Sequence, residues 1–328
     1  MSALVKKIGI MGEETEYVAC DELARTTADN AAALAAELNT RTNLLAIEHG
    51  GTGAASVVDA RAALEIHYDI QLLLGIYPGR NLAVVFAEEI AGYADEAEWF
   101  NARVVAGNFT GLRYFDYFEI TLTDGKVFTY RMACIDPDLH AVDTEVTTHH
   151  VAMVPDQVWP DSVLWNTTNT NQGKSTEKHP YICSNLHTWE INTFYALLPQ
   201  KWKNVIKPRR LLLEERYSAS SSLTASTGWS WVDLGKIWSL SEFEVYGEVT
   251  WGTPGYSQGM DCHFAEFFKT TAHRIRRNFS DARYAWWLRS AYGSSSTYVC
   301  FVSNNGIARD SAATYSGLRP LPCFLVGV

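Results

Sequence analysis

The chain has 328 residues, of which 47% are hydrophobic and 20% charged, a composition typical of a folded protein of about two domains. A net charge of -10 argues against nucleic acid as a partner, because the only basic clusters, within 201–210 and 274–277, are small and lie among apolar residues. No apolar run approaches the roughly 20 residues of a membrane helix, so membrane insertion is not expected. Residues 1–7 lack the apolar core of a secretory signal peptide.

Residues 21–47 predict one helix, because seven positions, given at the end of this paragraph, follow one another at alternating spacings of three and four residues. This spacing is compatible with a short oligomeric coiled coil and equally with an amphipathic helix that packs on a neighbour. A glycine-rich turn at 50–53 leads into a second predicted helix, 55–64; the turn lacks the Lys-Ser/Thr of a phosphate loop and follows a helix where a strand is expected. The recurring positions of the first helix are Ala24, Thr27, Ala31, Leu34, Leu38, Arg41 and Leu45.

All 11 tryptophans lie from Trp99 onward, where the pattern changes to strands and turns. Segments 117–122 and 127–132 predict a β-hairpin, because the Asp124-Gly125 pair between them is a strong turn signal. Short strands are predicted at 298–303 and 323–326, and residues 218–226 predict a serine-rich loop.

Two helices are predicted within this region. One covers 186–198 and ends at Pro199, and the other covers 242–246, where Ser241 and Glu244 have the spacing of a capping box. Helices and strands together predict the α+β class, with much irregular structure.

Metal binding and catalysis have weak support in the sequence. The six cysteines are scattered without a CxxC pair, which predicts free thiols and no zinc site. A group of acidic residues and histidines is the most metal-like cluster, but its irregular spacing favours a solvated loop, with His149 and His150 on opposite faces of a strand. No metal, cofactor or catalytic residue is therefore expected. The cluster comprises Asp136, Asp138, His140, Asp143, Glu145, His149 and His150.

The C-terminal segment 286–320 is the most distinctive part of the chain. Between Arg289 and Arg319 the only charged residues are Arg309 and Asp310, and the rest is largely Ser, Thr, Tyr, Asn, Gly and Ala. Tyrosine offers contact area at low entropic cost and serine offers adaptable hydrogen bonds, which is the chemistry of a binding face. We expect a scaffold of Trp286, Trp287, Leu288, Arg289, Arg319 and Pro320, and ligand contacts from Tyr292, Ser294, Ser296, Tyr298, Ser303, Asn305, Arg309, Asp310, Thr314 and Tyr315.

Two resemblances bear on function. The segment Gly50-Gly51-Thr52-Gly53-Ala54-Ala55 with Asp59 to Leu64 resembles an element common in the stalks of phage tail-fibre proteins. The region from Trp99 to Val328 resembles a C-type-lectin-like domain family of phages, prophages and gut bacteria, which is related in fold to the formylglycine-generating enzymes. The segments that carry the second resemblance are Asp116–Phe118, Asn169–Gly173, Leu198-Pro199, Val205–Lys207, Lys236–Glu242, Glu244–Gly247, Trp287–Ser290 and Gly317–Pro320.

Some members of that family are variable proteins of diversity-generating retroelements, whose ligand-binding face near the C-terminus is rewritten at adenine-containing codons. The resemblance implies a phage receptor-binding protein at the tip of a tail fibre of the virion, synthesised in the host cytoplasm. Its expected partners are a host-cell surface protein or glycan and other phage tail proteins, and the expected assembly is a homotrimer. The implied organisation is a helical stalk (1–66), a connecting helical segment (67–98) and a lectin-like domain (99–328).

Two alternatives remain open from the sequence. One is an enzyme of the formylglycine-generating type, which uses a reactive cysteine pair; the other is a bacterial surface-display protein with the same domain. Cys300 and Cys323 are the late cysteines in this chain, and both fall in apolar strand patterns without neighbouring cations that would activate a thiol. We therefore expect a binding protein and not an enzyme.

Overall fold

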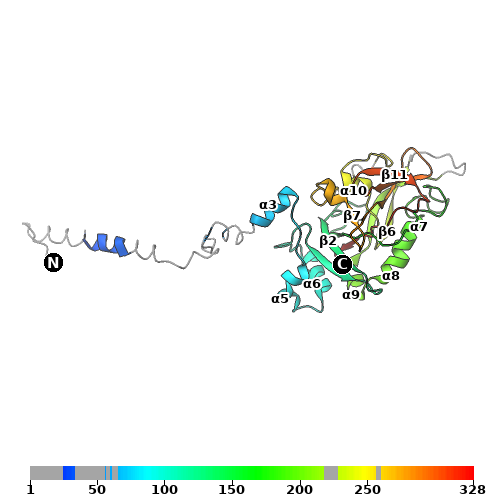
Figure 1. The fold of residues 1–328 in the computed structure, drawn as a ribbon. Coiled ribbons are helices and arrows are strands. Elements are labelled where there is room, and N and C mark those ends of the chain that lie inside the picture. The colour runs from blue at the N-terminus through cyan, green and yellow to red at the C-terminus, as the bar shows by residue number, and fades with distance from the viewer. Residues whose placement is uncertain (1–24, 34–55, 57–59, 61–65, 218–227, 256–259) are drawn as a thin grey trace, which may run out of the picture. The chain divides into compact units, whose positions relative to one another are not determined.

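The computed structural model describes residues 25–33, 56, 60, 66–217, 228–255 and 260–328 (Figure 1). The chain divides into two units, Met1–Gln71 and Leu72–Val328. In the first unit, residues 25–33 are helical with exposed side chains, within the helix predicted for 21–47. The remainder of that helix, the 50–53 turn, most of the 55–64 helix and the 218–226 loop lie outside the described residues. No helix in the described ranges is both long and apolar enough to cross a bilayer.

The second unit contains helices and strands in an α+β arrangement, as the sequence predicted. Its largest sheet has five antiparallel strands in the order β1-β2-β3-β12-β4. The predicted hairpin is confirmed, because β1 and β2 pair with Thr121 opposite Val127 and Gly125 takes a φ of 87° in the turn. The strands of this sheet are β1 (Tyr117–Thr121), β2 (Val127–Ile135), β3 (Val151–Pro155), β4 (Ile206–Lys207) and β12 (Phe324–Val326).

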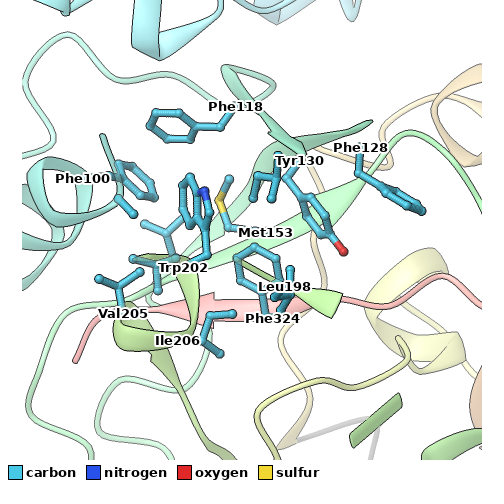
Figure 2. Close-up of a cluster of buried hydrophobic side chains, with 14 of the residues drawn as sticks. Phe100, Phe118, Phe128, Tyr130, Met153, Leu198, Trp202, Val205, Ile206 and Phe324 are labelled. Carbon is cyan, nitrogen blue, oxygen red and sulfur yellow. The ribbon is translucent and has the colours of Figure 1, made fainter. Parts of the chain in front are cut away.

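A hydrophobic core covers one face of this sheet (Figure 2). Trp202 is fully buried, and its ring lies 5.1 Å from Phe118 and 6.3 Å from Phe324, centroid to centroid. Alternate residues of β1 are buried, as expected for a strand with one face on the core. The helices on this side are α6 (Glu96–Val105), which supplies Phe100, and α9 (Gln200–Val205), which supplies Trp202.

The predicted connecting segment, 67–98, is divided between the two units, and its residues 72–98 belong to the second. Leu82 is fully buried in the core, and Arg80 forms an ion pair of 2.7 Å with the buried carboxylate of Asp116. These long-range contacts place the start of the unit before Trp99, the position at which the composition changes. The helices here are the end of α3 (Ile66–Leu74), α4 (Leu82–Val85) and α5 (Ala87–Ile90).

The helix predicted for 186–198 is present but contains a π-helical turn. It consists of α7 (Asn185–Trp189), η2 (Glu190–Phe194) and α8 (Tyr195–Leu197), and Leu198 is extended before Pro199. The helix α10 (Glu242–Tyr246) has the predicted capping box of Ser241 and Glu244, so this prediction is also confirmed.

Three smaller sheets complete the second unit. The C-terminal one has the order β11-β10-β9 and contains the strand predicted near 298–303, while the strand predicted for 323–326 is β12 of the large sheet. A short helix, α12 (Thr271–Arg274), precedes the smallest sheet. The strands are β5 (Arg209–Glu215) with β6 (Gly228–Gly235), β7 (Arg276–Arg277) with β8 (Arg283–Tyr284), and β9 (Trp286–Ala291), β10 (Tyr298–Val302) and β11 (Ala308–Ala312).

Candidate ligand-binding face

Strand β9 is the buried base of the C-terminal sheet. Trp286, Trp287 and Leu288 are fully buried, and Arg289 is almost fully buried. The indole N–H of Trp287 donates to the Val163 carbonyl at 2.8 Å, and the main-chain N–H of Trp287 donates to the Arg319 carbonyl at 3.0 Å. These residues were expected to be scaffold, and their burial leaves them no surface for a ligand.

Arg319 and Pro320, also expected in the scaffold, lie beside the small sheet β7–β8. Pro320 is buried, and its carbonyl accepts the Trp159 N–H at 3.0 Å. The guanidinium of Arg319 lies 4.9 Å from the ring centroid of Tyr284 in β8, a cation–π distance. The side chain of Arg319 therefore contacts β8, and its main-chain carbonyl is bonded to β9.

A buried ionic network lies beneath β9. Arg289 pairs with Glu244 at 2.6 Å and with Asp261 at 3.0 Å, and the other oxygen of Glu244 pairs with Arg209 at 2.6 Å. Arg209 also binds Asp138 through two nitrogens, at 2.7 and 2.9 Å. Burial opposes ionisation of Glu244, but the two guanidinium groups hold its pKa below the ordinary value. Because a single unpaired charge here would be costly, the network favours one arrangement of β9, α10 and the chain around Asp261.

Two fully buried side chains hold the loop between β9 and β10. The Asn171 side-chain amide donates to the carbonyls of Ser295, at 2.7 Å, and Tyr298. The Arg216 guanidinium donates to the carbonyls of Tyr292, at 2.6 Å, and Ser295, at 2.9 Å. The main-chain path of residues 292–298 is thus set by side chains that come from other parts of the chain.

A third contact holds the same loop from the side of residues 250–252. The carboxylate of Glu242 accepts the main-chain N–H groups of Thr250 at 3.0 Å and Gly252 at 2.8 Å. The Gly293 N–H donates to the Trp251 carbonyl at 2.8 Å, and a Cβ on Gly293 would lie 2.8 Å from the Gly252 carbonyl oxygen. Glycine is required at 293 because the two backbones approach so closely.

The side chains of this loop contribute an exposed polar and aromatic surface. Ser294 is exposed and Tyr298 is 40% exposed, while the Tyr292 ring lies 6.4 Å from that of Tyr298 and 5.8 Å from that of Trp251. Ser296 is half-buried, and its carbonyl accepts the Asn171 N–H. We call the surface formed by Trp251, Tyr292, Ser294, Ser296 and Tyr298 the aromatic face.

The end of β11 returns to this part of the molecule. Ala312 is the register partner of Tyr298, and the N–H of Ala313 donates to the Thr297 carbonyl at 2.9 Å. Thr314 and Tyr315 follow directly, with Thr314 half-buried and Tyr315 51% exposed. Thr314 and Tyr315, both predicted to contact the ligand, therefore directly follow residues that pair with the 292–298 loop.

Not all the predicted contact residues lie together. Ser303 and Asn305 are in the turn that joins β10 to β11, at the opposite end of this hairpin from Tyr298. A five-residue strand is roughly 13–17 Å long, so these two residues are too distant to share a small ligand with the aromatic face. Arg309 is exposed on the edge strand β11 opposite Phe301, and half-buried Asp310 is opposite Cys300.

The structure also identifies residues that sequence reasoning did not assign to the site. Asn171, Arg216, Glu242 and Trp251 lie far from segment 286–320 in sequence, yet they contact or support its loop. Asn171 and Glu242 fall in segments that carry the lectin-like resemblance, which is the only signal in the sequence that points to them.

The metal-like cluster at 136–150 separates into local pairs. His149 bonds to Asp136 at 2.6 Å and His140 to Glu145 at 2.7 Å, whereas Asp143 pairs with Arg210. Asp138 belongs to the ionic network described above, and His150 is fully buried while His149 is exposed in part. Within the described ranges, no group of three or more His, Cys, Asp or Glu side chains is arranged to hold a metal ion.

The two cysteines nearest the C-terminus, Cys300 and Cys323, are in apolar surroundings. Cys300 and Cys323 are fully buried, and burial raises the pKa of both thiols well above the ordinary value. Neither thiol is in a position to act as a thiolate near neutral pH.

The structure thus defines an α+β domain with an exposed aromatic and polar face held on a buried framework. The chain belongs to the family described as a domain of unknown function, DUF6273, which matches residues 151–326, more than half of the chain. No curated protein and no solved structure matches the chain. The matched segment begins in β3 and ends in β12, and Val151 and Val326 are register partners, so the two ends of the family domain meet on neighbouring strands.

Proposed function

We propose that the protein is a phage or prophage receptor-binding protein of the tail-fibre type, whose aromatic face binds a host-cell surface protein or glycan. One observation carries this proposal: the main chain of the 292–298 loop is held by buried Asn171 and Arg216, whereas Ser294 and Tyr298 project from it. A loop whose backbone is held from outside can change its exposed side chains at little cost in stability. This division of roles suits a face that is rewritten by a retroelement.

The chemistry of the face supports binding and not catalysis. Tyrosine and tryptophan rings contribute rigid contact area and hydroxyl groups contribute hydrogen bonds, a combination typical of protein paratopes. Buried titratable groups nearby are engaged in the framework: Arg289 pairs with Glu244, and the Glu242 carboxylate accepts main-chain N–H groups.

A C-type-lectin-like head is the fold that we propose for the region matched by the family. Support comes from the pairing of its terminal strands, β3 and β12, which brings the two ends of the matched region together.

We further propose that copies of the chain associate, as a homotrimer, beside the N-terminal end of this unit. Leu73 and Leu74 in α3 are 69% and 62% exposed, and Ile76, two residues after the helix ends, is also exposed. An apolar patch of this kind on a soluble domain indicates a protein contact. Several heads on one assembly would gain avidity without a tight individual site.

The test is binding of the purified, fluorescently labelled full-length protein to a panel of bacterial strains. The variant Tyr298→Ala combined with Ser294→Ala should bind its target strain at least about tenfold more weakly, as expected for loss of an aromatic contact residue. The matched control, Ser303→Ala with Asn305→Ala, alters the far end of the same hairpin and should bind as the parent does. Equal binding by the two folded variants would refute the assignment of the face.

A further inference from the structure

Two cysteines distant in sequence lie side by side in the structure. The Sγ atoms of Cys134, in β2, and Cys262, in the segment before Phe264, are 3.6 Å apart although 128 residues separate them. Because a disulfide bond is about 2.05 Å long, its formation requires the two sulfurs to approach by about 1.5 Å. Cys134 is 7% exposed, whereas Cys262 is half-buried and more accessible.

The surroundings shift the pKa values of the two thiols in opposite directions. The hydrogen bond between the two thiols lowers the pKa of Cys262, and nearby Arg209 has the same effect, against burial and the carboxylates of Glu244 and Asp138. The pKa of Cys134 is raised, by that hydrogen bond and by burial. Cys262 is the more exposed of the two thiols and the thiolate is the nucleophile in disulfide exchange, so Cys262 is the attacking thiol and Cys134 the resolving one.

We propose that Cys134 and Cys262 are a redox-active pair that a small-molecule disulfide closes into a cross-link. The Cys262 thiolate attacks one sulfur of the small disulfide, which forms a mixed disulfide and releases the first small thiolate. Cys134, on losing its proton, attacks the Cys262 sulfur, and the protein disulfide forms as the second small thiolate leaves. The two protons from the protein thiols are taken up by the two released thiolates, so two protein thiols are oxidised and one small disulfide is reduced.

The cross-link would join the five-stranded sheet to the segment that holds β9 through Asp261. Cys134 lies in β2 of the five-stranded sheet, and Cys262 directly follows Asp261, which binds Arg289 of β9. A bond that closes such a long loop restricts the unfolded chain strongly, so the oxidised protein should resist unfolding.

The experiment equilibrates the full-length protein with oxidised or reduced glutathione, blocks the remaining thiols, and maps the peptides by mass spectrometry. The oxidised sample should contain a peptide pair joined through Cys134 and Cys262, which disappears after reduction, and its urea midpoint should exceed that of the reduced sample. Cys183→Ser, which removes a different half-buried thiol, should leave both results unchanged, whereas Cys262→Ser should abolish both.

Peptide mapping of the parent protein tests the proposal even where a cysteine variant fails to fold. Recovery of Cys134 and Cys262 as blocked free thiols after oxidation would overturn it. So would a stable glutathione adduct on Cys262 without the cross-link, because it would show that Cys134 cannot reach the mixed disulfide.

Discussion

Replacement of Asn171 by alanine tests whether the aromatic face is held from outside. The change removes the hydrogen bonds from the side-chain amide to the carbonyls of Ser295 and Tyr298. Both carbonyls keep one other donor, from Arg216 and from the Tyr292 N–H respectively, so neither becomes fully unsatisfied. At about 1 kcal/mol for each lost bond, the free energy of unfolding should fall by about 2 kcal/mol. For a unit of this size that corresponds to a decrease in Tm of roughly 4–8 °C.

Urea unfolding followed by tryptophan fluorescence measures this loss directly. Asn169→Ala is the matched control, since Asn169 is exposed two residues away and its replacement should change the free energy of unfolding by less than about 0.5 kcal/mol. Ser294→Ala, on the face itself, should also stay within that limit. The reasoning would be refuted if Asn171→Ala were as stable as Asn169→Ala, or if Ser294→Ala lost as much stability as Asn171→Ala.

Three further predictions concern Glu190, the exposed leucines of α3 and Gly293. Burial raises the pKa of Glu190 to about 7 from an ordinary 4.5, so ionisation of Glu190 disfavours the folded state. The free energy of unfolding should therefore fall by about 3 kcal/mol as the pH rises from 4.5 through 7. In urea titrations, Glu190→Gln should remove this part of the pH dependence. Leu73→Glu with Leu74→Glu should reduce the mass measured by light scattering to that of a monomer, and an unchanged mass would rule out this patch as the contact between copies. Gly293→Ala should destabilise by about 1–3 kcal/mol in thermal unfolding, because the new Cβ meets the Gly252 carbonyl, and a neutral result would contradict the close approach.

The composition of segment 286–320 agrees with burial at its start and with exposure at Ser294 and Tyr298, but it did not reveal the shape of the segment. Trp286 and Trp287 are buried, and Ser294 and Tyr298 are at the surface, as their polarity suggests. The whole stretch was expected to form one face. In the structure, however, Asn305 and Tyr298 lie at opposite ends of the β10–β11 hairpin. Strand pairing, which composition does not encode, decides which parts of a segment share a surface.

Local sequence determined the elements whose signals act over a few residues. Asp124-Gly125 specified the β1–β2 turn, and Ser241 with Glu244 specified the start of α10, because turn geometry and capping depend on immediate neighbours. The α+β class likewise followed from the sequence, since the period of hydrophobic residues reports which elements form.

Only the tertiary structure decided how distant residues meet. Nothing in their local sequence brings Asn171 to the 292–298 loop, or Cys134 to Cys262, and these contacts depend on how the sheets pack on one another. Arg289 was expected to be scaffold, but its pairing with Glu244 and Asp261 was not predicted. The physical reason is that a side chain's neighbours within about four residues shape its local conformation, whereas burial, ion pairs and the position of a binding face are set by contacts across the folded chain.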